Sequence, residues 1–162
     1  SSEIGISFSQ DAYETILMLL EADPDCQIDG LTLLSNTLIY GNAELLDDFP
    51  CGKMAKSLVN ILNSDTEELI HVLTTQCIYN FLEAHPSSTR ALVDNQASQA
   101  IAKYLNGKPN LEATHNLIKA MEIISQYRPS EIAREIKIRP FLLVFSKLSK
   151  PDQKIAAQTM PK

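Results

Sequence analysis

Residues 85–126 read HPSSTRALVDNQASQAIAKYLNGKPNLEATHNLIKAMEIISQ, and this stretch decides the fold. Its proline, glycine and asparagine residues fall between apolar-periodic segments and therefore mark the breaks between helices. The pattern predicts a short helix near 88–95, a second helix over 97–105 and a long helix over about 111–126, which Asn110 caps. One structural unit of this chain is therefore expected to hold a short, a medium and a long helix.

The pattern has a period. Two short motifs recur at a step of 43 residues, namely His85-Pro86-Ser87 with Arg128-Pro129-Ser130, and Leu62-Asn63 with Leu105-Asn106. A helical period of about 40 to 47 residues is typical of armadillo and HEAT repeats, and three helices per unit favour the armadillo type over two-helix HEAT units. The sequence therefore predicts an all-α, armadillo-like solenoid, an α-α superhelix of about three and a half repeats.

The repeat pattern also predicts the domain organisation. We expect residues 1–162 to form one armadillo-like repeat domain, with units at about 9–50, 51–96 and 97–139 and a partial unit at 140–162. A repeat unit cannot bury its own apolar face, so a truncated last unit predicts a fragment of a longer chain. In the second unit, Ser64-Asp65-Thr66-Glu67 predicts a capping box before a long helix that reaches Ala84.

The composition fits a helical core, because 44% of the residues are apolar, only 6% are aromatic and there is no Trp. Cys26, Cys51 and Cys77 form no CxxC pair, which predicts reduced, mostly buried thiols in an intracellular protein of the nucleus, the cytoplasm or both. The longest apolar runs, 16–20 and 141–145, are too short to span a bilayer, so we expect no membrane partner. No signal peptide is recognisable either.

Charge is unevenly distributed along the chain. Residues 1–81 carry thirteen acidic and two basic side chains, a balance of −11, whereas residues 82–162 carry seven acidic and twelve basic ones, a balance of +5. An asymmetry of this size concerns partners more than fold. The basic residues are scattered singly without interleaved aromatic residues, so we expect no nucleic-acid partner.

The long helices predict a buried and an exposed side. Successive units place these core positions 43 residues apart: Leu31, Leu34 and Leu38, then Thr74, Cys77 and Phe81, then Leu117, Ala120 and Ile124. The opposite side predicts a candidate protein-binding groove on the concave surface, formed by Asn36, Tyr40, Gln76, Tyr79, Glu83, Lys119 and Glu122. Such side chains can bond an extended peptide or the rim of a globular partner. The alternative is that they form only the solvated face of amphipathic helices.

No motif predicts catalysis in this segment. None of the three histidines belongs to an HExxH motif, and neither G-x-x-x-x-G-K-S/T nor G-x-G-x-x-G occurs. Cys77 falls on the predicted inner side of its helix with no histidine four residues away, so nothing would activate it as a nucleophile. We therefore expect no catalytic, metal-binding or cofactor-binding residues.

Two turn segments carry a family resemblance. They are the run over 38–50, LIYGNAELLDDFP, and the run over 79–88, YNFLEAHPSS. They resemble the N-terminal armadillo region of HECT ubiquitin ligases of the ubiquitin-fusion-degradation type, which includes the thyroid-receptor-interacting ligase. In that family a helix ending in Gly-Asn leads to a Gly-rich or acidic turn and Phe-Pro, and the next repeat ends in Glu-Ala-x-Pro-x-Ser. The resemblance covers about residues 10–160.

The resemblance implies a role in ubiquitin conjugation. In that family the armadillo region recognises substrates or ubiquitin, far upstream of the HECT domain that holds the catalytic cysteine, and no position here matches that cysteine. It therefore implies a non-catalytic, protein-binding segment whose parent chain is a HECT-type ubiquitin-protein transferase. The expected partners are a ubiquitylation substrate, as protein or peptide, and ubiquitin.

Two other functions remain open at this point. Leu34-Ser35-Asn36 resembles the Leu-Ser-Asn of importin-α groove helices, which would make the chain a peptide-binding import adaptor. Importin-type grooves pair each Asn with a Trp, however, and the aligned positions here are Asn36, Tyr79 and Glu122 in a chain without Trp. The third possibility is an architectural scaffold, in which the charge asymmetry serves packing against neighbouring domains.

Overall fold

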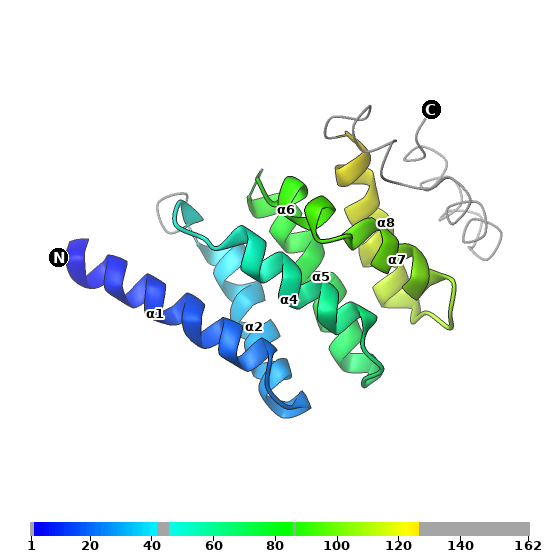
Figure 1. The fold of residues 1–162 in the computed structure, drawn as a ribbon, viewed down its shortest axis with the longest axis horizontal. Helices are drawn as coiled ribbons and strands as arrows, with labels where there is room; N and C mark the ends of the chain where they lie inside the picture. Colours follow the sequence, from blue (N-terminus) through cyan, green and yellow to red (C-terminus); the bar gives the residue numbers. More distant parts are fainter. Residues whose placement is uncertain (1, 42–45, 86, 127–162) are drawn as a thin grey trace.

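The computed structural model describes residues 2–41, 46–85 and 87–126, with side chains from residue 11 onward (Figure 1). The partial unit expected at 140–162 lies outside these residues. Within them the chain forms seven helices and no strands, so the all-α prediction is confirmed. The helices are α1 Ser2–Leu20, α2 Pro24–Tyr40, α4 Cys51–Asn63, α5 Glu68–Ala84, α6 Ser88–Asp94, α7 Ala97–Leu105 and α8 Leu111–Gln126. None of these helices combines the length and the hydrophobicity that crossing a membrane requires.

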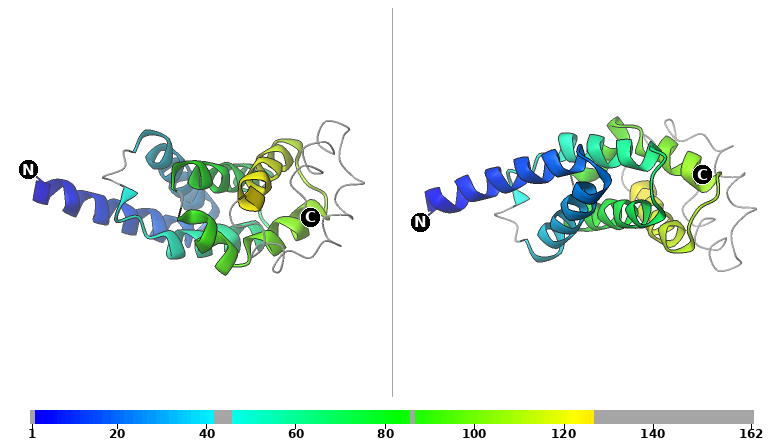
Figure 2. Two further views of the ribbon diagram at one scale, coloured as in Figure 1. Left: turned by 90° about the horizontal axis from the view of Figure 1, so that it is seen from above. Right: turned by 90° about the horizontal axis from the view of Figure 1, so that it is seen from below.

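The helices form two layers. The long helices α2, α5 and α8 lie side by side in one layer, with α5 in the middle. Helices α1, α4 and α7 form the second layer, and the short helix α6 packs against α4 and α7 (Figure 2). Each long helix therefore has one side against the second layer and one side away from it. We call this second side of α2, α5 and α8 the long-helix face.

The register between the long helices reproduces the period of the sequence. Three hydrogen bonds join neighbouring long helices through residues 41 to 46 apart: Cys77 Sγ to the Leu31 carbonyl oxygen, Asn80 Nδ2 to Ser35 Oγ, and Asn116 Nδ2 to Thr75 Oγ1. On α2 and α5, both partners advance together along the chain, so these helices run parallel. The 43-residue step of the motifs is thus also the approximate spacing of residues that meet across a helix seam.

The core positions predicted from the periodicity are confirmed. All nine predicted positions on α2, α5 and α8 are buried, and Phe81 is the largest fully buried side chain. Spacings of three and four residues put these side chains on one side of each helix, which here faces the second layer and the neighbouring helices. Burying a large aliphatic or aromatic side chain contributes roughly 1.5–3 kcal/mol, so this stripe is a major source of stability.

Phe49 explains the Phe-Pro turn between α2 and α4. Its ring lies 5.2 Å from the ring of Tyr13 on α1 and 5.3 Å from that of Phe81 on α5, between centroids. The His85 ring, at the end of α5, is 6.1 Å away. Aromatic pairs at these separations and tilted orientations are favourable beyond their burial. The turn therefore anchors both layers to each other at one end of the molecule.

The helix ends confirm most of the predicted breaks. Helices α7 and α8 have the predicted bounds, and α6 ends one residue earlier, at Asp94. Asn110 caps α8 as predicted, since its Oδ1 accepts a hydrogen bond of 3.0 Å from the Ala113 backbone N–H. Helix α1 begins at Ser2, upstream of the expected unit start near residue 9.

The predicted capping box at 64–67 is wrong. Ser64 instead ends α4, because its backbone N–H and its hydroxyl both donate to the Ile61 carbonyl oxygen, at 3.0 and 2.6 Å. Helix α5 begins only at Glu68, and the side chain of the preceding Glu67 makes no capping hydrogen bond. The serine hydroxyl is used by the helix before the turn and is not available to the helix after it.

Two glycines are required by close approaches. Gly30 lies inside α2 where α1 crosses it, and a Cβ atom there would lie 2.8 Å from Leu19 Cβ. Gly41 ends α2, and a Cβ atom there would collide with the carbonyl oxygen of Thr37, to which the Gly41 N–H donates at 2.8 Å. The glycine at position 41 is therefore explained by lack of space and not by a left-handed backbone, since its φ is −70°.

We predict that Gly30→Ala lowers the free energy of unfolding by about 1–3 kcal/mol, because the added methyl group pushes α1 away from α2. The matched control is Gly52→Ala in α4, where a Cβ atom meets nothing within 4 Å. This control should instead stabilise the helix by about 0.5–1 kcal/mol. Urea unfolding followed by circular dichroism measures both, and a Gly30→Ala variant as stable as the control would contradict the close crossing.

Candidate protein-binding surface

The seven residues predicted for a binding groove all lie on α2, α5 and α8. Tyr40 is 82% exposed. Asn36, Gln76, Glu83 and Lys119 are also exposed, and Tyr79 and Glu122 are half-buried. They share the long-helix face, because the other sides of these helices are occupied by the core and by the second layer. Whether this face binds a partner stays a prediction.

Four of the seven residues come together in a group that we call the Tyr79 cluster: Tyr79, Glu83, Lys119 and Glu122. The Tyr79 hydroxyl donates to Glu83 Oε1 at 2.8 Å, and Lys119 Nζ lies 5.6 Å from the centroid of the Tyr79 ring. The hydrogen bond to Glu83, partial burial and the charges of Glu83 and Glu122 raise the pKa of Tyr79 above its usual value. The phenol is therefore neutral and acts as a hydrogen-bond donor.

The other three residues stand apart from this cluster. Among the hydrogen bonds, ion pairs and ring contacts of the described residues, none joins Asn36, Tyr40 or Gln76 to it. Gln76 lies one turn before Tyr79 on α5, and the other two lie on α2. The structure therefore brings four of the predicted residues of α5 and α8 together and leaves Gln76 and the two residues of α2 as separate exposed side chains.

Sequence reasoning missed the polar side chains that fix the helix seams. Asn80 bonds Ser35 at 3.0 Å between α5 and α2, and Asn116 bonds Thr75 at 3.2 Å between α8 and α5. Paired amides and hydroxyls of this kind are costly to separate because unpaired partners would remain partly buried. Asn80 directly follows the predicted groove residue Tyr79, but no pattern in the sequence indicated that Ser35 would be its hydrogen-bond partner.

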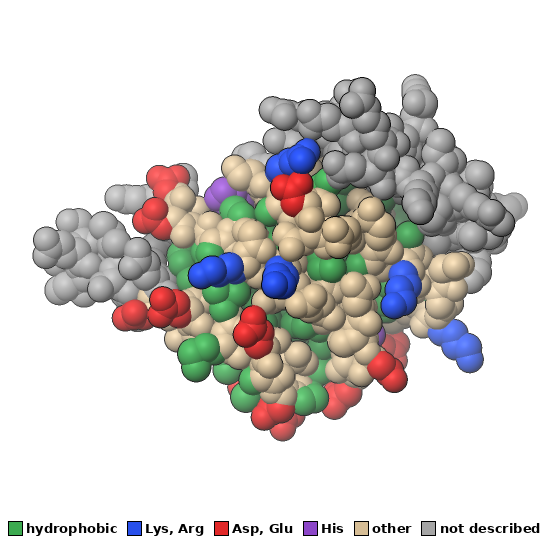
Figure 3. Space-filling view, viewed as in Figure 1, with side chains coloured by type: hydrophobic (Ala, Val, Ile, Leu, Met, Phe, Trp, Pro, Cys, Tyr) green, Lys and Arg blue, Asp and Glu red, His purple; other side chains and the backbone are tan. Residues whose placement is uncertain are grey.

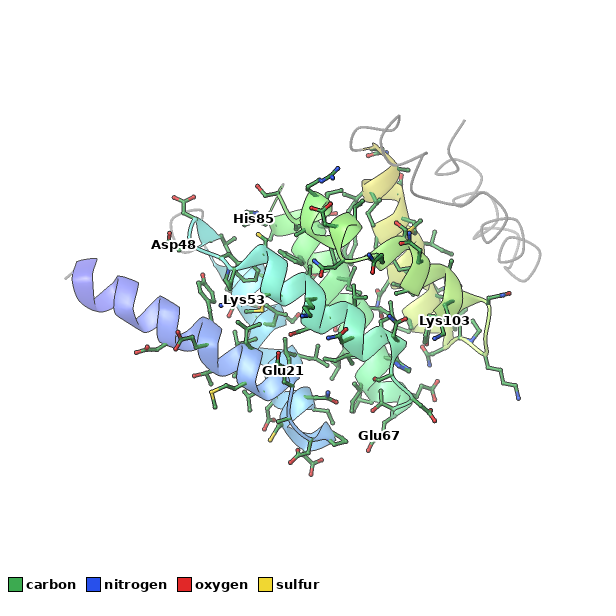
Figure 4. The ribbon with its side chains drawn as sticks, in the orientation of Figure 1. Glu21, Asp48, Lys53, Glu67, His85 and Lys103 are labelled. Atoms are coloured by element: carbon green, nitrogen blue, oxygen red, sulfur yellow. The ribbon has the colours of Figure 1, made fainter. Side chains whose placement is uncertain are left out.

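The two layers differ in net charge. The long helices carry six carboxylates and one lysine, whereas α1, α4, α6 and α7 together carry four cations and four carboxylates, three of which lie on α1. Figure 3 shows the face of the second layer, with Lys and Arg mainly over its middle and right and Asp and Glu mostly along its left and lower edges. Lys53 on α4 and Lys103 on α7 belong to that layer (Figure 4). The long-helix face is therefore the acidic one.

A pocket that the sequence did not predict lies between the α4–α5 and α7–α8 turns. It has a volume of about 460 Å³ and is lined by residues that include Glu68, His71, Lys103, Tyr104 and Asn110. Four of its lining residues contact one another in pairs: Glu68 accepts a hydrogen bond from Asn110, and the His71 and Tyr104 rings pack edge to face at 5.2 Å. These contacts join α5 to the α7–α8 turn.

All three cysteines are free thiols, and Cys51 and Cys77 contact other groups. Cys77 is fully buried, and burial raises its pKa to about 12. Cys51 is half-buried, with Sγ 3.7 Å from His85 Nδ1, while His85 Nε2 lies 3.0 Å from the Leu46 carbonyl oxygen. Burial raises the pKa of the Cys51 thiol too, so it stays neutral near pH 7 and links the start of α4 to the end of α5. Only Cys77 is buried as predicted, since Cys26 and Cys51 are half-exposed.

Most of this chain is similar to part of a known protein. The E3 ubiquitin-protein ligase UPL3 of Arabidopsis thaliana is 24% identical over 139 residues, which cover 86% of this chain and 7% of that protein. The chain therefore spans a small part of the length of this relative. No family model matches the chain, and no solved structure does. The similarity supports the ubiquitin-ligase part of the resemblance seen in the turn motifs.

We predict that Glu83→Gln lowers the pKa of Tyr79 toward 10, because the variant removes the carboxylate that favours the protonated phenol. The matched control is Glu68→Gln at the other end of α5, eleven residues away. Its charge is separated from Tyr79 by more than a screening length of about 10 Å, so the pKa should not change. Nuclear magnetic resonance of ring-labelled tyrosine across pH 8–12 measures the pKa of Tyr79 in each variant. Equal pKa values in the two variants would refute the hydrogen bond between Tyr79 and Glu83.

Proposed function

We propose that this chain is a non-catalytic, protein-binding armadillo segment of a HECT-type ubiquitin ligase, which recognises a substrate protein or ubiquitin. The observation that carries the proposal is the similarity to a ubiquitin-protein ligase over 86% of the chain. It agrees with the turn motifs around Gly41 and Phe49, which resemble that class of ligase. The activity of the whole ligase would then reside in other parts of a longer protein.

The arrangement of the helices supports the armadillo part of the proposal. A short, a medium and a long helix follow one another as α6, α7 and α8. The long helices α2, α5 and α8 stack in one layer, and the medium helices α4 and α7 stack in the other. Units that contact mainly their neighbours are what a repeat solenoid is built from.

The chemistry of the long-helix face supports protein binding. It combines exposed amides and charges with Tyr40, whose ring is almost fully accessible. Leu33 and Ile39, also on α2, are large apolar side chains that are about half exposed. Tyrosine residues and accessible apolar side chains within a polar rim are common at protein interfaces. An extended peptide or the edge of a folded protein could bond to such a surface at several adjacent positions.

We predict that ubiquitin or a substrate peptide, added to the isotope-labelled chain, shifts the backbone amide resonances of α2, α5 and α8. Gln76→Arg, at the centre of this face, should weaken binding about tenfold, as changes near the centre of an interface often do. The matched control is Asn60→Arg, an exposed amide on α4 in the second layer, which should leave the affinity unchanged.

Two results would contradict the proposal. The first is a full titration series, with ubiquitin and with peptides of known ligase substrates, that moves no resonance of the long helices. The second is a greater loss of affinity for Asn60→Arg than for Gln76→Arg, which would move the interface to the second layer.

A further inference from the structure

The Tyr79 cluster holds more negative charge than its single lysine neutralises. Glu83 and Glu122 lie on either side of the seam between α5 and α8, and Lys119 is the one cation among the three long helices. Among the described residues, Lys119 forms no ion pair within 4 Å with either carboxylate. The ion pair found in this part of the chain joins Arg90 and Asp94. Both carboxylates therefore keep capacity for another cation.

The Tyr79 ring already has a cation over it. Lys119 Nζ lies 5.6 Å from the ring centroid, within the range of a cation–π interaction. Glu83 holds the hydroxyl end of the ring at 2.8 Å, so the ring orientation is fixed from within α5. Lys119 is exposed and reaches the ring on a long flexible side chain from α8. It is therefore easily displaced, whereas the ring and its orientation remain.

We propose that Tyr79, Glu83 and Glu122 form a binding site for an arginine side chain of the partner protein, and that Lys119 occupies this site in the free chain. Arginine fits better than lysine because its planar guanidinium can stack on the ring while its fork of N–H groups bonds a carboxylate. The inference rests on the proposed function, since it names the chemistry of the partner that the same face takes.

The acidity of the surroundings supports this occupant. Glu83 and Glu122 outnumber the one lysine of the cluster, so its local field is negative and an arginine-bearing segment complements it. A neutral or acidic segment would gain nothing from that field. The exposed amides of Asn36 and Gln76 can bond the backbone of a segment whose arginine lies in the cluster.

The test is a titration of the labelled chain with the peptide acetyl-Ala-Ala-Arg-Ala-Ala-amide, followed on the Tyr79 ring and on the α5 and α8 amides. The matched peptide carries citrulline, which has the shape of arginine without its charge. We expect the arginine peptide to bind at least tenfold more tightly than the citrulline peptide. Equal binding of the two peptides would overturn the inference.

Single substitutions distinguish binding at the Tyr79 cluster from unspecific attraction to a negatively charged surface. Lys119→Gln should strengthen binding of the arginine peptide about threefold to tenfold, because it removes the competing cation. Glu122→Gln should weaken it by a similar factor, whereas Glu112→Gln, at the exposed start of α8, should leave it nearly unchanged. A loss of binding in Lys119→Gln, or equal losses in the two glutamate variants, would overturn the inference. All three positions are exposed or half-exposed, and circular dichroism checks that each variant folds.

The two proposals can fail separately. If ubiquitin or a substrate shifts the long-helix resonances while the arginine peptide does not, the arginine site is wrong and the proposed function stands. If the arginine peptide binds the cluster while neither ubiquitin nor any ligase substrate binds the chain, the site is right and the proposed function is wrong.

Discussion

The packing of α5 between α2 and α8 is the interaction on which the rest of the structure depends. The inner side of α5 holds Thr74, Cys77 and Phe81, all fully buried. Cys77 donates to the Leu31 carbonyl oxygen on one side, and Thr75 accepts from Asn116 on the other. Phe81 reaches Phe49 in the turn before α4 and so ties the long helices to the second layer. A substitution on the inner side of α5 therefore disturbs the packing of every neighbouring helix.

This packing also determines what the outer side can do. Because the seams fix the register of the helices, Lys119 of α8 lies over the Tyr79 ring of α5, and Glu122 follows it one turn later. The long helices carry a net negative charge, whereas the charges of α1, α4, α6 and α7 balance, so the two layers differ in charge. The charge of a partner therefore determines which face of the molecule it can bind.

The sequence predicted those features that depend on local or periodic signals. The long helices, the cap at Asn110 and the buried stripe through Leu34, Cys77 and Ala120 follow from spacings within single helices and from one repeated step. The capping box failed because Ser64 can serve either adjoining helix, and only the structure shows which one it serves. The period predicted that the residues of the Tyr79 cluster share one side of α5 and α8, but it gave no distances between the helices. The crossing at Gly30 and the pocket between the turns likewise depend on contacts that no local pattern encodes.

Amide hydrogen exchange of a Phe81→Leu variant tests most directly whether the three long helices act as one unit. The substitution removes part of a buried ring and should lower stability by about 1 kcal/mol or more. If α5 holds the layer together, exchange of the slowest amides should accelerate by a similar factor in α2, α5 and α8. Faster exchange confined to α4 and α5, with α2 and α8 as protected as in the unmodified chain, would contradict the account.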